Sequence, residues 1–253
     1  MKIKFLGTGT SHGVPVPGCN CNTCKSSDPR NNRFRSSIYV EWEDKSCLID
    51  TPPEHRLQMV KWGAPKPDII LFTHGHADHI MGFDDIRSLN WRKNGEITCY
   101  CNQETEARIR EAFSYIFAEQ GTKGGGLPQA KIKNISMLPE PWENLITPLP
   151  VKHGKMDVLG YKIGSAAYLT DVSKIPETTR KLLTDIELLI LGVLRKRQHP
   201  THLSLAEGIE IADDLNANRN YFVHMSHDLE YQTINKALPE HIDLAFDGLS
   251  VKV

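Results

Sequence analysis

The chain contains 253 residues, a length that one large domain can accommodate. Its 30 lysines and arginines nearly balance its 31 acidic residues, so the formal net charge is -1. This balance excludes a strongly basic overall field for nucleic acid or an acidic membrane, and any attraction for an anion must be local. The sequence contains neither a signal-peptide core nor a run approaching the roughly 20 apolar residues of a membrane span, so we expect a soluble, cytoplasmic protein.

Short apolar segments typical of β-strands alternate with helical segments, which predicts one domain of mixed α/β class over residues 1–253. The predicted strands are, in chain order, KIKFLG, SSIYVEW, SCLID, DIILFTH, EITCYC, VLGYKIG, AAYLTD, IELLILG, NRNYFVH and HIDLAFDGLSVKV. The predicted helices cover residues 55–62, 79–91, 104–118, 176–183 and 204–215. Ser204 and Glu207 are spaced as a capping box for the last helix. The glycines of residues 120–129 predict a loop, either a plain connection or a flap over a pocket.

A dense group of potential metal ligands follows the apolar strand DIILF. The segment reads THGHADH and places His74, His76, Asp78 and His79 within six residues. The small residues between the ligands leave room for the imidazoles to converge at the end of a strand. Because imidazole and carboxylate ligands suit Zn, Mn or Fe, the sequence predicts a metal site here.

Three more candidate ligands stand at the ends of other apolar segments, namely His153 in LPVKHG, Asp171 in YLTD and His224 in YFVH. If these strand ends meet at one edge, the seven side chains form two metal sites. The predicted grouping assigns His74, His76 and His153 to one metal, assigns Asp78, His79 and His224 to a second, and makes Asp171 the bridge between them.

These seven positions resemble the metallo-β-lactamase superfamily, whose His-x-His-x-Asp-His motif is followed by a later His, Asp and His. The resemblance spans nearly the whole chain. It implies an α/β fold of the four-layer αββα type, with a dinuclear metal site at one edge of the two sheets. Asp50, at the end of SCLID, corresponds to a strand-end aspartate of the family. It either orients the metal loop or is an ordinary turn residue.

A second cluster lies in the loop at about 18–25, where Cys19, Cys21 and Cys24 fall within six residues. In a reducing cytosol such a cluster indicates a metal site rather than disulfides, although free thiols remain the alternative. Three thiolates lack one ligand of a tetrahedral structural zinc. His227 is the candidate for the fourth position. The cysteines at 99 and 101 alternate on a strand and are expected to be buried apolar residues.

The Cys-x-Cys-x-x-Cys loop after GTGT, with His-x-x-His at 224 and 227, resembles one branch of the superfamily. This is the phosphoribosyl cyclic phosphate phosphodiesterase branch of the carbon-phosphorus lyase pathway. The resemblance implies structural zinc on the three cysteines and His227, and a dinuclear site that commonly works with manganese. It also implies a further catalytic histidine, to which His202 corresponds. A surface position before a helix is the alternative for His202.

The expected function is dinuclear metal-dependent hydrolysis of a small cyclic or nucleotide-like phosphodiester by a metal-bridging hydroxide. Asp78 and His202 are the predicted catalytic residues, and His202 would stabilise the phosphorane or protonate the leaving alkoxide. Two dications offset by Asp78, Asp171 and hydroxide leave about one positive charge, which favours an anionic substrate. Residues 195–197, Arg-Lys-Arg, either hold a second phosphate or form a solvated surface run.

Other functions remain open. An RNA 3′-processing endonuclease of the same superfamily is the first alternative, although the neutral overall charge argues against it. A lactonase or thioester hydrolase is another, and a non-catalytic metal-binding scaffold is the alternative of a different class. We expect two catalytic divalent metals (Mn or Zn), one structural Zn and a small anionic phosphodiester substrate. No nucleic-acid or membrane partner is expected, and a homodimer remains open.

Overall fold

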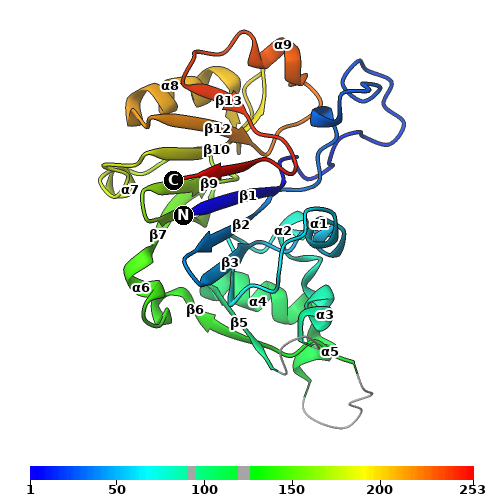
Figure 1. The fold of residues 1–253 in the computed structure, drawn as a ribbon, viewed down its shortest axis with the longest axis vertical. Coiled ribbons are helices and arrows are strands. Elements are labelled where there is room, and N and C mark those ends of the chain that lie inside the picture. Colours follow the sequence, from blue (N-terminus) through cyan, green and yellow to red (C-terminus); the bar gives the residue numbers. More distant parts are fainter. Residues whose placement is uncertain (91–94, 119–125) are drawn as a thin grey trace.

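The computed structural model describes residues 1–90, 95–118 and 126–253 (Figure 1). Its first sheet has the order β14-β1-β2-β3-β4-β5-β6. These strands are β1 Lys2–Gly7, β2 Ser37–Trp42, β3 Lys45–Ile49, β4 Ile69–Leu71, β5 Ile97–Cys101, β6 Ala130–Asn134 and β14 Ser250–Lys252. The second sheet has the order β13-β12-β10-β9-β8-β7, with β11 paired to β10. Its strands are β7 Ile146–His153, β8 Met156–Ile163, β9 Ala166–Leu169, β10 Leu188–Arg195, β11 Leu203–Ser204, β12 Arg219–Val223 and β13 Ile242–Leu244.

Helices cover the outer faces of the two sheets. The α-helices are α1 His55–Lys61, α2 Ala77–Ile80, α3 Arg87–Asn90, α4 Gln103–Ala112, α5 Ser114–Phe117, α6 Trp142–Leu145, α7 Glu177–Arg180, α8 Leu205–Leu215 and α9 Tyr231–Asn235. Short 3-10 helices are η1 Pro29–Asn31, η2 Phe83–Ile86 and η3 Ile135–Met137. None of the helices in the described ranges has the length and apolar character needed to cross a membrane.

Apolar side chains form one cluster between the sheets and one on each outer face, which is the layering of an αββα sandwich. The central cluster includes Phe5, Leu71 and Ile190. Tyr161 crosses this layer and donates its hydroxyl hydrogen to the Phe72 carbonyl at 2.6 Å. This bond ties the second sheet to the chain that leaves β4, so the packing of the core fixes the start of the ligand segment.

Both sheets contain a run of parallel strands, β3 to β6 in one and β9, β10, β12 and β13 in the other. Parallel strands end at the same edge of a sheet, and ligand sites of α/β proteins gather there. The segments after β4, β9 and β12 carry candidate ligands, and β7 ends on another. The topology therefore brings residues far apart in sequence to one edge.

The predicted α/β four-layer fold is confirmed, but several element boundaries were wrong. The expected helix over 79–91 is divided into α2, η2 and α3, and residue 91 lies outside the described residues. At the break between α2 and η2, a Cβ atom on Gly82 would lie 2.2 Å from the Pro52 carbonyl oxygen, so this position accepts only glycine. The helix over 104–118 divides at Phe113, and that over 176–183 is reduced to α7.

The C-terminal segment HIDLAFDGLSVKV was expected to be one strand, and it is two. β13 belongs to the second sheet and β14 to the first, with Gly248 at φ +92° in the turn between them. In contrast, α8 begins as expected: Ser204 and Glu207 form both hydrogen bonds of a capping box. Of the expected loop at 120–129, residues 120–125 lie outside the described residues.

Candidate functional site

The seven candidate ligands of the dinuclear site meet at one edge of the sandwich. Four follow β4 on the first sheet, and the other three come from the ends of β7, β9 and β12 on the second. The structure divides them as the sequence predicts. One group is His74, His76, His153 and Asp171, and the other is Asp78, His79, Asp171 and His224; within each group the ligand atoms all lie within 4.8 Å of one another.

Two of the candidate ligands and the supporting residue Asp50 have left-handed backbone conformations, which set the direction of their side chains. Asp50 has φ +65°, Asp171 has φ +44° and His224 has φ +58°. Non-glycine residues adopt such angles at a cost, and they cluster at functional sites. Asp50 and His224 directly follow β3 and β12, and Asp171 is the second residue after β9. In a strand, successive side chains point to opposite faces of the sheet. The left-handed turn breaks this alternation and directs the side chain toward the ligand groups.

In the first ligand group, the ring nitrogens are held ready for a metal. The Nδ1–H of His153 donates to the Thr201 carbonyl at 2.8 Å, which leaves Nε2 to act as a ligand. The Nε2 atom of His74 is buried and has no hydrogen-bond partner among the described residues. Gly75 permits this arrangement because a Cβ there would lie 2.8 Å from the Arg108 side chain.

The second group has the spacing of ligands around one ion. His79 Nε2 lies 3.2 Å from Asp171 Oδ1 and 3.4 Å from Asp78 Oδ2. Tetrahedral bonds of roughly 2.1 Å separate two ligand atoms by about 3.4 Å. The Nε2 atom of His79 is also buried, and in the described ranges it has no hydrogen-bond partner. These separations and unpartnered nitrogens fit a divalent metal better than they fit a hydrogen-bonded cluster.

Asp171 faces both groups at once. Its Oδ1 lies 3.0 Å from His224 Nδ1 and 3.2 Å from His79 Nε2, whereas its Oδ2 lies 3.8 Å from His74 Nε2. Each carboxylate oxygen is therefore directed at a different ligand group. This is the geometry that a bridging carboxylate requires.

Asp50 supports the site from behind. It accepts a hydrogen bond from His79 Nδ1 at 2.7 Å, and it also accepts hydrogen bonds from the Thr73 amide and hydroxyl. These contacts fix both the His79 ring and the start of the ligand segment. Of the two roles considered for Asp50, the structure shows the orienting one.

Burial and charge oppose each other in the ionisation of the cluster. Burial disfavours the charged form of His79, but Asp171, Asp78 and Asp50 surround the ring and raise its pKa well above the usual value. Burial also opposes ionisation of Asp171, but His224 and His79 lower its pKa well below the usual range. Asp171 thus retains negative charge, for which divalent cations are suitable partners.

His202 lies directly before β11 and closes one side of the site. Its ring stacks on His224 with centroids 5.0 Å apart and meets the edge of His153 at 4.6 Å. Burial, and then the nearby His224, lower the pKa of His202 to about 3. The ring contacts one member of each ligand group. His202 therefore lies at the site, and the alternative interpretation, a surface position before a helix, was wrong.

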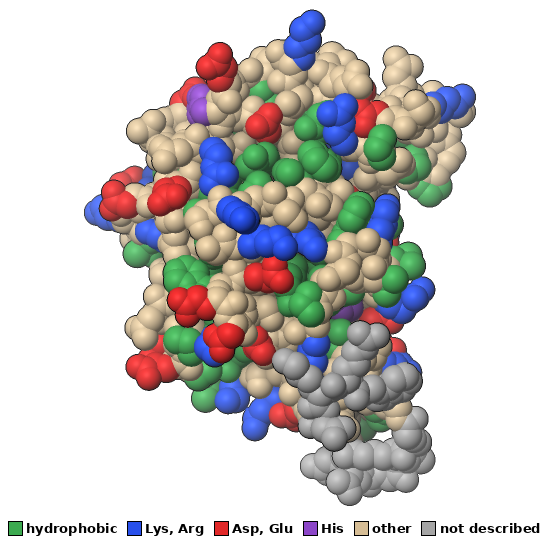
Figure 2. Space-filling model, in the orientation of Figure 1, with side chains coloured by type: hydrophobic (Ala, Val, Ile, Leu, Met, Phe, Trp, Pro, Cys, Tyr) green, Lys and Arg blue, Asp and Glu red, His purple; other side chains and the backbone are tan. Residues whose placement is uncertain are grey.

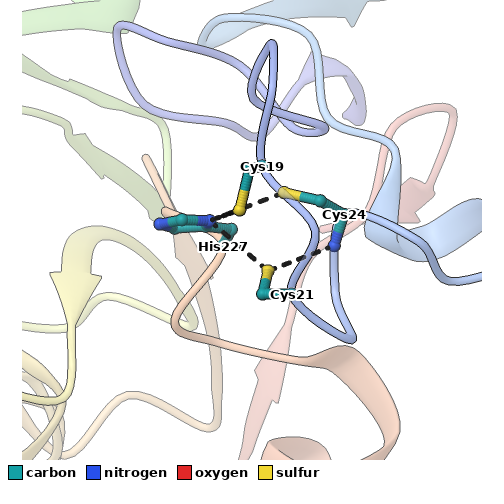
Figure 3. A group of neighbouring side chains, drawn as sticks. All are labelled: Cys19, Cys21, Cys24 and His227. Carbon is teal, nitrogen blue, oxygen red and sulfur yellow. Dashed lines mark hydrogen bonds between the residues drawn. The ribbon is translucent and has the colours of Figure 1, made fainter.

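The cysteine cluster forms a separate site (Figure 3). The three Sγ atoms of Cys19, Cys21 and Cys24 converge on one atom, Nδ1 of His227, at 3.3, 3.5 and 3.5 Å. Zn–S and Zn–N bonds of about 2.3 and 2.0 Å in a tetrahedron place sulfur and nitrogen roughly 3.5 Å apart. The donor set and its spacing therefore fit a structural zinc. The cysteines at 47, 99 and 101 are buried in the core, as expected for the last two.

Sequence reasoning missed several supporting residues. Thr10 Oγ1 lies 3.2 Å from His224 Nε2, Ser36 Oγ lies 3.3 Å from its Nδ1, and Thr201 fixes His153 through its carbonyl. Hydroxyl and backbone groups carry no distinctive sequence signal. His199, whose ring lies 5.2 Å from that of His202, was also missed. The His-x-x-His spacing of 199 and 202 is the signal that could have found it.

The basic run at 195–197 divides into two parts. The guanidinium of Arg195 turns back and donates to the carbonyls of Arg197 and Gln198. Lys196 and Arg197 are exposed. Arg195 therefore stabilises its own loop, and the run has the solvated character that was one of its two interpretations.

Comparison with known proteins agrees with this geometry. A model of the beta-lactamase superfamily domain matches residues 46–225, more than half of the chain. The chain belongs to the metallo-β-lactamase superfamily. A solved structure of a new diphosphatase from the PhnP family is 40% identical, with a TM-score of 0.91, and the alignment covers 100% of this chain and 97% of that one. The chain therefore also belongs to the PhnP family.

Two curated relatives are matched over only part of their own length. An octanoyltransferase of Porphyromonas gingivalis is 33% identical over 252 residues, which is 98% of this chain and 51% of that protein. A ribonuclease Z of Clostridium acetobutylicum is 36% identical over 61 residues, which is 23% of this chain and 20% of that protein. The chain thus spans about half the length of the first relative and a fifth of the second.

Proposed function

We propose that the chain is a two-metal phosphodiesterase that hydrolyses a small anionic phosphodiester and carries a separate structural zinc. The observation that carries this proposal is the position of Asp171, whose two oxygens face two convergent ligand groups. Similarity across the whole chain to a PhnP-family diphosphatase supports phosphoester chemistry. Manganese or zinc suits the imidazole and carboxylate ligands, and thiolates favour zinc.

Each residue has a distinct role in this proposal. When bound, two divalent cations supply Lewis acidity and a water of lowered pKa. One is held by His74, His76 and His153, the other by Asp78, His79 and His224, and Asp171 bridges the two. Asp78 also orients the attacking water by accepting its hydrogen bond, and Asp50 keeps the His79 ring in place.

His202 acts on the substrate rather than on a metal in this proposal. Its ring contacts His153 and His224 and faces the space between the two ligand groups. There its neutral ring donates a hydrogen bond to a phosphoryl oxygen, or, once the anionic substrate has raised its pKa and it has taken up a proton, it delivers that proton to the leaving alkoxide. General acid catalysis of this kind contributes roughly 100- to 10,000-fold.

An RNA 3′-processing endonuclease is the second candidate, and the local similarity to ribonuclease Z favours it. Acidic and basic side chains are interspersed on the face shown in Figure 2, and the formal net charge of the chain is -1. Affinity for an RNA backbone depends on clustered basic residues. The charge distribution therefore favours a small substrate over RNA. Since none of the six cysteines forms a disulfide, we propose that the protein acts in a reducing cytoplasm.

A turnover screen of the metal-loaded protein tests the proposal. The panel contains bis-p-nitrophenyl phosphate, ribose and nucleoside cyclic phosphates, lactones, an octanoyl thioester and precursor tRNA. We expect hydrolysis of the small phosphodiesters alone. Activity confined to precursor tRNA would favour the endonuclease, and activity confined to the thioester or lactones would reassign the chemistry. Inactivity on the whole panel would favour a metal-binding scaffold.

A further inference from the structure

The six cysteines fall into two sets that differ in their access to solvent. The set of the core is fully buried and comprises the cysteines at 47, 99 and 101. Cys19, Cys21 and Cys24 are half-buried, and the asparagines between them, Asn20 and Asn22, are exposed. Figure 1 shows that their loop projects from the sandwich beside α9. Because the reactivity of a thiol depends on its exposure, a small oxidant in solution reaches the loop sulfurs but not those of the core.

The loop sulfurs lie close enough to react with one another. The three Sγ atoms and a ring nitrogen of His227 all lie within 4.8 Å of one another (Figure 3). The Cys24 amide donates to Cys21 Sγ at 3.4 Å, and the Val16 amide donates to Cys24 Sγ at 3.4 Å. Hydrogen bonds to sulfur favour the thiolate, which is the form that attacks an oxidant.

The spacing of the cysteines selects one pair. Cys21 and Cys24 have the Cys-x-x-Cys spacing of dithiols that form reversible disulfides. Cys19 and Cys21 have a single residue between them, so a disulfide that joined them would close a smaller and more strained ring.

Protein contacts hold the base of the loop without a metal. In η1, Asn31 Nδ2 donates to Glu230 Oε1 at 2.9 Å, and Asn31 Oδ1 accepts from the Tyr231 amide at 2.8 Å. The guanidinium of Arg30 lies 4.1 Å from the centre of the Tyr231 ring. Opening of the cysteine cluster therefore frees the part of the loop before η1 and leaves η1 attached to α9. The rest of the chain keeps its fold, so the change can be reversed.

We propose that Cys21 and Cys24 are a reversible oxidation site, which a peroxide converts into a disulfide with release of the zinc from the cluster. One thiolate attacks a peroxide oxygen and becomes a sulfenic acid, while the O–O bond breaks and a water leaves. The second thiol attacks the sulfenic sulfur, which forms the S–S bond and releases a second water. Two thiols thus lose two electrons and two protons, and one hydrogen peroxide gains them and becomes two waters.

The disulfide removes half of the ligands of the cluster. Cys19 and His227 remain, and two ligands hold zinc far less tightly than the four of a structural site. His227 lies three residues after the candidate ligand His224, so oxidation also detaches the loop from the segment that carries His224. This inference rests on the structural zinc of the proposed function and is independent of the phosphodiesterase chemistry.

Titration of the reduced protein with hydrogen peroxide tests the site without turnover. The protein contains zinc at the cysteine cluster and manganese at the dinuclear site, so a metallochromic chelator reports zinc from the cluster. We expect about one zinc per chain to be released as a disulfide forms between Cys21 and Cys24, which peptide mapping by mass spectrometry locates. The three core thiols should stay reduced. Dithiothreitol and added zinc should restore the starting state.

Two results would overturn the proposal. One is zinc retained without any disulfide at peroxide concentrations that oxidise a model peptide thiol. The other is zinc release that accompanies only sulfinic or sulfonic acids, because dithiothreitol does not reverse those products.

Two alanine variants form a matched pair. Cys19→Ala and Cys24→Ala each remove one zinc ligand from the same loop, but only the second removes a member of the proposed disulfide. Cys19→Ala should still form the disulfide between Cys21 and Cys24. Cys24→Ala should instead accumulate a sulfenic acid at Cys21, which dimedone traps. Equal disulfide formation in both variants would reject the assigned pair.

The zinc content of the reduced protein separates this inference from the zinc site on which it rests. Zinc in the reduced protein, with no reversible disulfide after peroxide, would reject the oxidation site and leave the structural zinc standing. Absence of zinc from the reduced protein, together with a reversible disulfide between Cys21 and Cys24, would keep the oxidation site and reject the structural zinc.

Discussion

The two candidate metal sites differ in how the fold holds them. The candidate dinuclear ligands stand near strand ends, and most of them are buried, with His74 at 1%, His79 at 0% and Asp171 at 2% exposure, whereas His76 and Asp78 are partly exposed. The three cysteines and His227 are half-buried, and the cysteines lie on a loop. The sheets position the first set whether or not a metal is bound. We expect the second set to need a bound metal to stay together, so loss of a ligand should affect activity in one site and stability in the other.

The two sites nevertheless meet on one short segment. His224 and His227 flank Met225, whose amide donates to the Thr8 carbonyl and whose carbonyl accepts from the Thr10 amide. The buried Arg33 donates to the carbonyls of Ser226 and Leu229. Damage at the cysteine site can therefore reach His224 through this segment, which makes it necessary to measure stability and metal content separately from turnover.

The largest effect is expected from Asp171→Ala. This change removes the carboxylate that faces both ligand groups, so turnover should fall by at least about 1000-fold and the catalytic metals should be lost. Elemental analysis should find about three metals in the wild-type chain and only the zinc in the variant.

Asp185→Ala is the matched control because Asp185 also has a positive φ, +58°, but is exposed. It should show the same backbone strain with full turnover. Comparable activity losses in the two variants would mean that backbone conformation causes the loss, and the bridging role of Asp171 would be rejected.

His202→Ala should have the next largest effect. The residue is outside both ligand groups, so metal content and melting temperature should stay near those of the wild type. On a diester with an alkoxide leaving group, kcat should fall by roughly 100-fold or more with little change in KM. Nitrophenolate leaves as a stable anion, so a smaller loss on bis-p-nitrophenyl phosphate would identify proton delivery.

Equal losses on both substrates would instead assign His202 to the phosphoryl oxygens. His241→Ala is the control, because His241 is a surface histidine paired with Asp213 and should give wild-type kinetics. Wild-type rates for His202→Ala on both substrates would remove this residue from the active site.

The dinuclear site was predictable because its signals are local. Ligand residues stand directly after apolar strands, and the strand pattern itself predicts that parallel strands share an edge. β7 was not among the predicted strands because Pro148 and Pro150 interrupt its sequence. The structure places β7 at the edge of its sheet, where missing amide hydrogens are tolerated.

What could not be predicted depends on contacts between distant segments. Residue 82 has to be glycine because the Pro52 carbonyl lies beside it, and Thr201 orients His153 through a carbonyl that every residue possesses. No residue-type signal marks such contacts. The sequence therefore predicts which candidate ligands converge, but it predicts poorly the residues that hold them in place.

Cys21→Ser tests the cysteine site and should act mainly on stability. A serine hydroxyl does not replace a thiolate ligand, so the zinc should be lost after mild chelation and the melting temperature should fall. Cys47→Ala is the control, because Cys47 is fully buried in the central cluster. That variant should lose some stability but keep its zinc. Wild-type zinc content and melting temperature in Cys21→Ser would contradict the proposed division between the sites.

The smallest effect concerns Asp247, beside the loop that joins the two sites. Burial raises the pKa of this carboxyl to about 7, although hydrogen bonds from Phe34 and Thr8 and the charge of Arg33 oppose the shift. The folded state therefore binds the proton more tightly than the unfolded chain. This contribution to stability is complete below about pH 4 and is lost as the pH rises through about 7.

Asp247→Asn removes this titration while keeping a group that accepts one hydrogen bond. Urea unfolding at several pH values should show the stability of the wild type, relative to the variant, falling by up to about 4 kcal/mol from pH 4 to above pH 7. Loss of metals at low pH affects both proteins and cancels in the difference. Asp185→Asn, at an exposed turn, should show no such trend. A constant difference between wild type and Asp247→Asn over this range would mean that the carboxyl is ionised throughout. The hydrogen bonds from Phe34 and Thr8 would then outweigh burial at the junction of the two sites.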